Sequence, residues 1–457
     1  MSFKLGITCA LAAFGSYLFY NQGVGVNYFI FTLLSSLFAL YNSKTKPLDR
    51  RLLAVLPPLT SALLLVFYPQ GLTYAVWLIS YLVMWSAVPL RLQPLLLPLQ
   101  GIFSMVESPV FILKKYKNSE GFKSRGKAKK DRLFTYGITS LIVFGFTLLY
   151  SSGNPVFANL LSHIDLSYID FGYFFTAVAI FILLIGLVFI KINEDVVGWN
   201  RKSTTLLFTK VTEKEKREFN IANLSIWIIA GVLCVVNTMD IVVLFGGKLP
   251  ENMTYSEYVH QGFNILILSL SLAIGLIVYF FRNQLNFMEN IQKLRLASYV
   301  WISQNIALAM LTAYKNMIYV EVYGLTYKRV AVFLCLACTL IGLLLSFRKI
   351  KIPSTNWLYF NRVAFYAFIC SVVISIVPFD HIITEYNLKY SQTKDIAYLL
   401  KLNHADLKEV KRYLEKSGQK YTVLYYKSEA KILELNEQAK EGKWQSWNMY
   451  LSSYLKD

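Results

Sequence analysis

The sequence predicts an all-α polytopic integral membrane protein with about eleven transmembrane helices and a small, mostly helical C-terminal tail outside the cytoplasm. Apolar runs of about 17–25 residues recur along the chain, the length that a helix needs to cross roughly 30 Å of hydrocarbon. The mean hydropathy of +0.45 and the 55% share of hydrophobic residues exceed those of an ordinary soluble domain. A strong bias in the positions of Lys and Arg then indicates the orientation.

The apolar runs divide the chain into four regions. Residues 1–91 form an N-terminal four-span region, 92–132 an interfacial or re-entrant segment with a basic cytoplasmic loop, 133–378 a seven-span body and 379–457 the outward tail. The predicted spans are residues 4–20, 25–42, 52–68, 71–90, 133–151, 171–191, 220–245, 260–281, 296–314, 327–347 and 357–378.

Positive charge is distributed very unevenly between the two sides of this threading. Of the 33 Lys and Arg residues among positions 1–378, 29 fall on one side. Cytoplasmic loops retain Lys and Arg because translocating these residues is unfavourable. The N-terminus is therefore expected in the cytoplasm and the C-terminus outside, as an odd number of spans requires. The basic residues on the opposite side are Lys248, Lys315, Lys328 and Arg329.

Residues 92–112 do not fit a simple span. They are apolar enough to enter a bilayer, but basic segments flank them on both sides, and Pro94, Pro98, Gly101 and Pro109 interrupt the helix. An interfacial or re-entrant helix is favoured over a span. The alternative, a true crossing, would invert every later segment and violate the charge bias.

The net charge of +19 does not indicate a nucleic-acid partner. Residues 379–457 carry 13 basic and 11 acidic residues, so nearly all of the surplus lies in loops that flank apolar runs. Membrane topology and anionic lipid account for charge in such loops. The expected partner is the lipid bilayer.

Cofactor and metal chemistry are not indicated either. The five cysteines all lie in apolar runs, and the pair Cys335 and Cys338 has neither a second pair nor a nearby histidine, so packing is favoured over zinc or redox chemistry. The four histidines are scattered, and the chain has no GxxxxGK[ST], HExxH or GxSxG motif. We expect no cofactor, no metal and no catalytic residue.

The tail beyond Pro378 predicts a small helical unit. Residues 391–417 show two amphipathic helices that break at Asn403 or His404, and Gly418 closes the second. Residues 421–426 alternate as a short strand or extended link would, and 428–441 predict another helix. The last aromatic residues form either a membrane-interface belt or, as we favour, the core of the tail; they are Trp444, Trp447, Tyr450 and Tyr454.

Four separated segments carry a family resemblance. They are Asn154–Phe157, Thr254–Phe263, Tyr314–Arg329 and Trp444–Asn448. In this order they resemble a family of bacterial multi-span proteins called the four-one-seven-three domain of unknown function, which is grouped with the four-one-five-three domain. The resemblance covers roughly residues 130–457, whereas the first four spans carry no such motif. It implies a multi-helix body in the bacterial cytoplasmic (inner) membrane and supplies no activity.

Ionisable residues of these segments cluster at the outer face of the threading. One interpretation is an outward-facing pocket in which Glu257 and His260, three residues apart on a helix, form an acid–base or ligand-binding pair. The favoured interpretation is structural: the residues cap helices, as in a capping box from Thr254 to Glu257, or pair with Arg329 or Lys315. The candidate pocket residues are Asp240, Glu257, His260, Glu321 and Arg329.

Amide side chains interrupt two of the predicted spans. Gln304 and Asn305 lie in span 296–314, and Asn237 lies in span 220–245. Such side chains can line a substrate path, but hydrogen bonds between neighbouring helices are the favoured interpretation.

Two functions remain compatible with the sequence. The favoured one is a non-enzymatic inner-membrane envelope protein, an accessory, sensing or interaction component whose tail engages another envelope protein. The alternative is a transporter or membrane-embedded transferase for a small solute or lipid that uses the outward-facing polar pocket.

Overall fold

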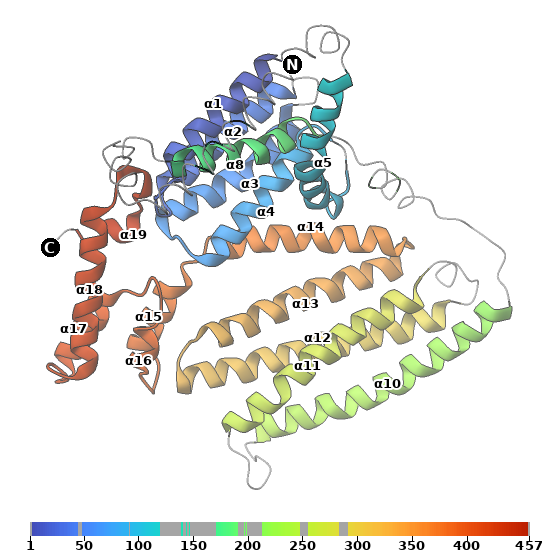
Figure 1. Ribbon diagram of the computed structural model, residues 1–457. Coiled ribbons are helices and arrows are strands. Elements are labelled where there is room, and N and C mark those ends of the chain that lie inside the picture. The colour runs from blue at the N-terminus through green and yellow to red at the C-terminus, as the bar shows by residue number, and fades with distance from the viewer. Residues whose placement is uncertain are drawn as a thin grey trace.

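A computed structural model describes residues 2–43, 48–90, 92–118, 171–190, 213–246, 255–282 and 291–455, together with isolated positions between 139 and 198. The regular structure in these residues is entirely helical. A helix occupies each predicted span except 133–151, most of which lies outside the described residues. Figure 1 shows two bundles of nearly parallel helices with a third, smaller helical unit across one end.

Among the described residues, the N-terminal bundle has five long helices and a sixth that lies across them. The long helices are α1 (Ser2–Phe19), α2 (Val26–Asn42), α3 (Leu48–Phe67), α4 (Gly71–Ala87) and α8 (Phe171–Val188). Their core includes the fully buried Leu18, Leu65 and Met84. Buried polar side chains pair across helices, since Trp77 Nε1 donates a hydrogen bond to Thr32 Oγ1 at 2.8 Å.

Helix α5 (Leu96–Asn118) contains most of the predicted interfacial segment. It packs against α4 and α8 and runs across their direction in Figure 1. The approach is close at two glycines: Gly101 faces the carbonyl of Leu82, and Gly186 of α8 faces the backbone of Met105. Whether α5 lies in the membrane interface stays a prediction.

The second bundle contains α10 (Glu213–Gly246), α11 (Tyr255–Phe280), α12 (Gln292–Tyr323), α13 (Tyr327–Lys351) and α14 (Asn356–Ser375). Its core includes Ile226, Leu270, Leu294 and Leu343, all fully buried. Helix α14 joins the two bundles, because Thr73 Oγ1 donates a hydrogen bond to the Ser375 carbonyl at 3.3 Å.

The exterior of both bundles is strongly apolar, as a lipid environment requires. On α10, Val232, Val242 and Phe245 are among the many large apolar side chains that stand exposed. Among the described residues, five helices are long and apolar enough to cross a membrane; they are Phe171–Val188, Lys216–Gly246, Gln292–Tyr323, Tyr327–Lys351 and Asn356–Ser375. The count of eleven spans stays a prediction.

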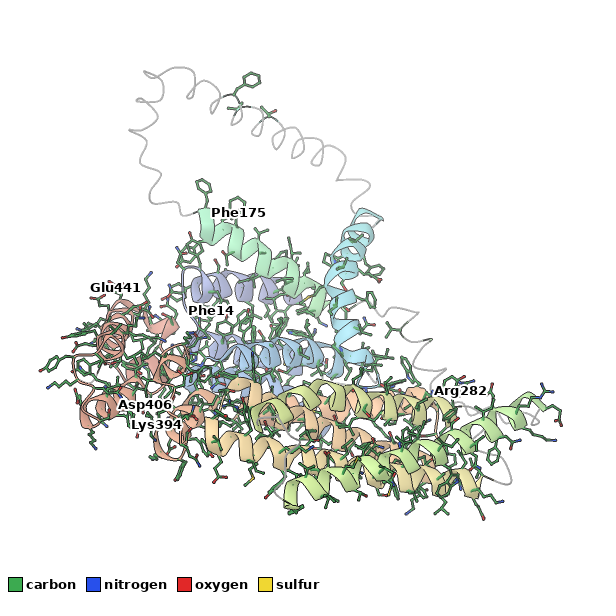
Figure 2. All side chains as sticks on the ribbon, turned by 90° about the horizontal axis from the view of Figure 1, so that it is seen from below. Phe14, Phe175, Arg282, Lys394, Asp406 and Glu441 are labelled. Atoms are coloured by element: carbon green, nitrogen blue, oxygen red, sulfur yellow. The ribbon has the colours of Figure 1, made fainter. Side chains whose placement is uncertain are left out.

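The tail forms a helical unit that we call the cap, residues 379–455. It contains α15 (Phe379–Lys389), α16 (Ile396–Leu399), α17 (Leu407–Lys416), α18 (Val423–Glu441), the short 3-10 helix η2 (Trp444–Ser446) and α19 (Met449–Ser452). Figure 2 shows cap residues Lys394, Asp406 and Glu441 at one end of the molecule and Arg282, just after α11, near the other.

The cap has its own core because its helices are amphipathic. Leu407, Val410 and Leu414 form the buried stripe of α17, which Asp406 caps by accepting a hydrogen bond from the Glu409 amide at 3.1 Å. The helix ends at Lys416, and Gly418 follows two residues later with a φ of +73°, which suits glycine. The predicted break at Asn403 or His404 and the closing role of Gly418 are therefore confirmed.

The prediction of a strand or extended link at 421–426 is wrong. Thr422 Oγ1 accepts a hydrogen bond from the Tyr425 amide at 3.4 Å, which caps α18 and starts it at Val423. The alternating aromatic pattern at 421–426 is therefore part of the first turns of a helix, which begins five residues before the predicted one.

Candidate functional site

The segment Tyr314–Arg329 forms the end of α12, a tight turn and the start of α13. Gly324 ends α12 with a φ of +80°, and a Cβ at this position would lie 2.6 Å from Asn387 Oδ1. Thr326 then caps α13 by accepting a hydrogen bond from the Arg329 amide at 3.4 Å. Glycine is required at position 324 because of its positive φ and because Asn387, in the cap of residues 379–455, lies so close.

Arg329 is held against this turn. Its guanidinium carbon lies 4.3 Å from the centre of the Tyr319 ring, and Nη1 donates hydrogen bonds to the carbonyls of Tyr323 and Gly324. The side chain of Glu321 is exposed, and the described residues contain no ion pair between it and Arg329. Arg329 therefore stabilises the end of α12 through the Tyr319 ring and two backbone carbonyls, whereas the favoured interpretation had named it as an ion-pair partner.

Asp240 lies away from the turn, in a buried ion pair. Its Oδ1 is 2.7 Å from Lys315 Nζ, and the two side chains are only 16% and 8% exposed. Asp240 belongs to α10 and Lys315 to α12, which extends well beyond the predicted span 296–314. A pair this well buried is costly to break, because removing one partner leaves the other charge without compensation.

The amide side chains lie along the same contact between α10 and α12. Asn237 Nδ2 donates a hydrogen bond to the Gln304 carbonyl at 3.0 Å, while Asn305 Nδ2 donates to Trp301 of its own helix at 2.7 Å. The buried Asn237 Oδ1 and Gln304 Oε1 have no hydrogen-bond partner among the described residues. The two helices are parallel, since later residues of α10 meet later residues of α12.

Glu257 and His260 fall within the first turns of α11. Their side chains, and Thr254 of the proposed capping box, lie outside the described part of the chain. Of the five candidate pocket residues, the structure thus places Asp240 in a helix–helix contact, Arg329 against the turn and Glu321 on the surface. The described side chains do not converge on one pocket.

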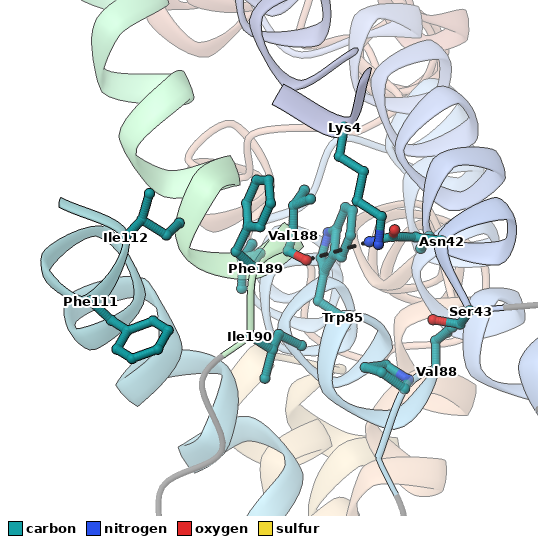
Figure 3. Close-up of a pocket in the computed structure, with 13 residues that line it drawn as sticks. Lys4, Asn42, Ser43, Trp85, Val88, Phe111, Ile112, Val188, Phe189 and Ile190 are labelled. Atoms are coloured by element: carbon teal, nitrogen blue, oxygen red, sulfur yellow. Dashed lines mark hydrogen bonds between the residues drawn. The ribbon is translucent and has the colours of Figure 1, made fainter. Parts of the chain in front are cut away.

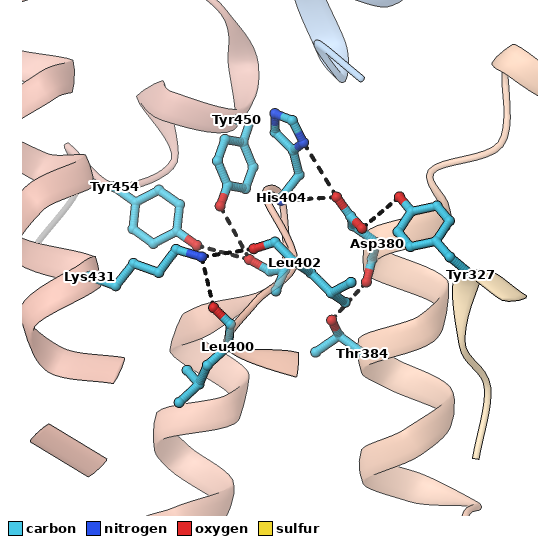
Figure 4. Close-up of polar contacts among 10 residues, drawn as sticks. Tyr327, Asp380, Thr384, Leu400, Leu402, His404, Lys431, Tyr450 and Tyr454 are labelled. Carbon is cyan, nitrogen blue, oxygen red and sulfur yellow. Dashed lines mark hydrogen bonds and ion pairs between the residues drawn. The ribbon is translucent and has the colours of Figure 1, made fainter. Parts of the chain in front are cut away.

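A buried polar network around Asp380 was not predicted as a site (Figure 4). Asp380 is 2% exposed; Tyr327 Oη donates to its Oδ1 at 2.7 Å, and the His404 amide donates to Oδ2 at 3.0 Å. His404 Nδ1 lies 3.4 Å from the same oxygen. Burial opposes ionisation, but these hydrogen bonds and the imidazole hold the pKa of Asp380 below its usual value.

Asn387 makes a second connection between the cap and this turn. Its Oδ1 accepts a hydrogen bond from the Leu325 amide and its Nδ2 donates to the Leu325 carbonyl at 2.8 Å. The sequence around Asn387 gives no signal for its contact with Leu325, because Leu325 lies 62 residues away.

The segment Trp444–Asn448 binds the turn between α1 and α2. The Val26 amide donates to the Trp447 carbonyl at 2.9 Å, and Asn448 Nδ2 donates to the Val24 carbonyl at 3.0 Å. Gly25 is in such close contact with the backbone of Trp447 that a Cβ would overlap it. The cap is thereby attached to both bundles.

The terminal aromatic residues differ in burial. Tyr454 is buried in the cap core and Tyr450 packs against it, as the favoured interpretation predicted. Trp444 and Trp447 are half exposed, and the Trp444 ring lies 6.2 Å from that of Tyr17 in α1.

Two depressions lie beside the contacts of the cap with the bundles, and a third lies at the end of the N-terminal bundle that is far from the cap. One of about 700 Å³ lies between the start of α13 and the cap, and one of about 640 Å³ lies between the cap and residues 21–24; both include Asn403. The third, about 360 Å³, lies at the other end of the N-terminal bundle, where Lys4, Asn42 and Trp85 line it (Figure 3). The described residues contain no cluster of His, Cys, Asp and Glu that could hold a metal ion.

The apolar exterior and long helices together define a helical membrane protein. Residues 7–413 match the family described as "Domain of unknown function (DUF4153)", and the chain therefore belongs to that family. The match includes the N-terminal bundle, where the sequence offered no recognisable motif, and ends within α17, before Trp444. Neither the curated proteins nor the solved structures include a match.

Proposed function

We propose that this protein is a non-enzymatic component of the bacterial inner-membrane envelope and that its cap engages another envelope protein outside the cytoplasm. The observation that carries the proposal is the attachment of the cap to the turns of both bundles, through Asn387 on one side and Asn448 on the other. A unit attached at two points presents its remaining surface in a fixed orientation.

The surface that supports this role is an apolar stripe on α18. Val423, Tyr426 and Leu433 are 70%, 53% and 58% exposed, and Ala430 between them is exposed as well. Their spacing places them on one face of the helix. Contiguous exposed apolar residues on a water-facing unit are typical of protein–protein contacts.

The topology that we propose has a cytoplasmic N-terminus, eleven spans, α5 in the cytoplasmic interface and an outward cap. The distribution of Lys and Arg supports it, and so does the position of Arg282 far from the cap. A phosphatase reporter fused after Lys456 should be active, whereas a fluorescent reporter that needs the cytoplasm should be dark. The reverse result would overturn the outward cap.

Photo-crosslinking in cells tests the partner-binding role directly. A photoreactive residue at Tyr426 or Leu433 should capture an envelope protein that mass spectrometry identifies, while the same residue at the exposed Gln438, about 100° around α18 from the stripe, should not. With the probe at Tyr426, Leu433→Asp should abolish capture at unchanged membrane abundance. Equal capture at all three positions, or capture of a second copy alone, would overturn the proposal.

The alternative function is transport or group transfer through the polar contact between α10 and α12. The unpartnered oxygens of Asn237 and Gln304, on the same α10–α12 contact as the Asp240–Lys315 pair, favour it. Complementation of a deletion strain separates the two functions. The interaction role expects loss of complementation on deletion of residues 391–457 and its retention in the double variant Asn237→Leu/Gln304→Leu. The alternative expects the double variant to fail at normal abundance.

A further inference from the structure

Three cationic side chains gather where α13 begins. Lys328, Arg329 and Lys401 line the depression of about 700 Å³ between α13 and the cap, together with Tyr327, Tyr398 and Leu402. Lys328 and Arg329 come from the first turn of α13, and Lys401 follows α16. The depression thus combines a cationic rim with aromatic and aliphatic walls.

The position of these cations is unusual for the chain. Under the proposed topology, Lys328 and Arg329 are two of only four basic residues among positions 1–378 on the outer side. Another of the four, Lys315, forms an ion pair with Asp240. Because Lys and Arg are disfavoured on that side, two neighbouring cations at one depression indicate a ligand that compensates them.

Asp380, the one carboxylate among the described residues that line the depression, offsets only one of the three positive charges. Asp380 is buried and already accepts hydrogen bonds from Tyr327 and His404. Arg329 is fixed by Tyr319 and by the carbonyls of Tyr323 and Gly324, so its charge stays at the rim. The N-terminal end of α13 adds partial positive charge to the same place.

We propose that this depression binds the phosphate headgroup of an anionic lipid from the outer leaflet. Lys328, Lys401 and the edge of Arg329 contact the phosphate, while Tyr327, Tyr398 and Leu402 contact the glycerol and the upper acyl chain. The apolar walls and the position at the first turn of a membrane-crossing helix favour a lipid over free phosphate. The proposal rests on the outward cap proposed above but not on any protein partner.

Lipid retention by the purified full chain tests the proposal. In nanodiscs, phosphatidylglycerol should bind in preference to phosphatidylcholine, as measured by native mass spectrometry of the released protein. The double variant Lys328→Gln/Lys401→Gln should weaken phosphatidylglycerol binding about tenfold or more. Arg329 is left intact because it also holds the α12–α13 turn.

The matched control also removes two positive charges, but from a part of the cap that does not line the depression. Lys416→Gln/Lys420→Gln, at the exposed end of α17, should leave phosphatidylglycerol binding unchanged. An equal loss in both double variants would mean non-specific attraction and overturn the site. Full displacement of phosphatidylglycerol by millimolar inorganic phosphate would overturn the lipid assignment in favour of a soluble phosphate ligand.

Discussion

Asn387 binds the backbone of Leu325 through both ends of its amide, as acceptor from the Leu325 N–H and donor to its carbonyl. Asn387 is 4% exposed and lies in the first helix of the cap, whereas Leu325 lies in the turn between two long helices. This pair therefore sets the position of the cap on the second bundle.

Asn387→Ala should destabilise the attachment of the cap by about 1–3 kcal/mol, because the backbone groups of Leu325 lose their partners. Thermal unfolding in detergent and protease cleavage within the cap measure the loss. Asn436→Ala is a matched control, since the buried Oδ1 of Asn436 has no hydrogen-bond partner among the described residues. Equal effects of the two substitutions would show that the Leu325 contact has no special role.

Gly324→Ala should be more destabilising than Gly418→Ala. Both glycines have positive φ, +80° and +73°, and so share the cost of that conformation, about 1 kcal/mol or more. A Cβ at Gly324 also meets Asn387 Oδ1 at 2.6 Å, whereas one at Gly418 meets open space. The difference between the two melting temperatures isolates the steric contact, and a larger effect at Gly418 would contradict the structure.

Lys315→Met should lower the free energy of unfolding by about 3–5 kcal/mol, because it removes the ammonium group that lies 2.7 Å from the largely buried Asp240 carboxylate. The double variant Asp240→Leu/Lys315→Met should recover most of this loss, since neither charge then remains buried. Membrane abundance and thermal stability in detergent give the double-mutant cycle. Simple additivity of the two single effects would mean that the pair is not coupled.

Stability should depend on Asp380 in acid. Because the folded-state pKa of Asp380 is held below its usual value, its contribution is fully present above the unfolded-state pKa of about 4 and is lost as pH falls through the folded-state pKa. Melting temperatures from pH 7 to pH 3 should therefore fall less steeply at the acid end for Asp380→Asn than for the natural protein. Parallel curves would exclude this role.

The membrane-protein class and the helix positions could be predicted from the sequence because both depend on local properties. Hydropathy and periodicity located the helices of both bundles, and the stripe Leu407, Val410 and Leu414 located α17. The error at 421–426 arose because the spacing of the aromatic residues fits both a strand and a helix. The N-cap hydrogen bond that Thr422 Oγ1 accepts from the Tyr425 amide starts a helix there.

The contacts of the site could not be predicted in the same way. Pairing with Lys315 was part of the favoured interpretation, but the sequence did not specify Asp240 as its partner, because α12 extends beyond its apolar segment and carries Lys315 into the contact with α10. Asp380 and Asn387 have partners 24 to 62 residues away, and nothing local to either residue specifies those partners. The side chains of Glu257 and His260 lie outside the described residues, so their proposed pairing stays a prediction.

The hydrogen bond from Asn448 to Val24 joins positions 424 residues apart. A ribosome makes the first of these positions early and the second only after every long helix of both bundles. The loop between α1 and α2 therefore stays uncovered throughout synthesis and is closed by one of the last segments to emerge. In a stalled or shortened copy, that loop stays accessible to quality-control proteases. Such proteases can therefore cleave unfinished copies at the α1–α2 loop and leave finished copies intact there.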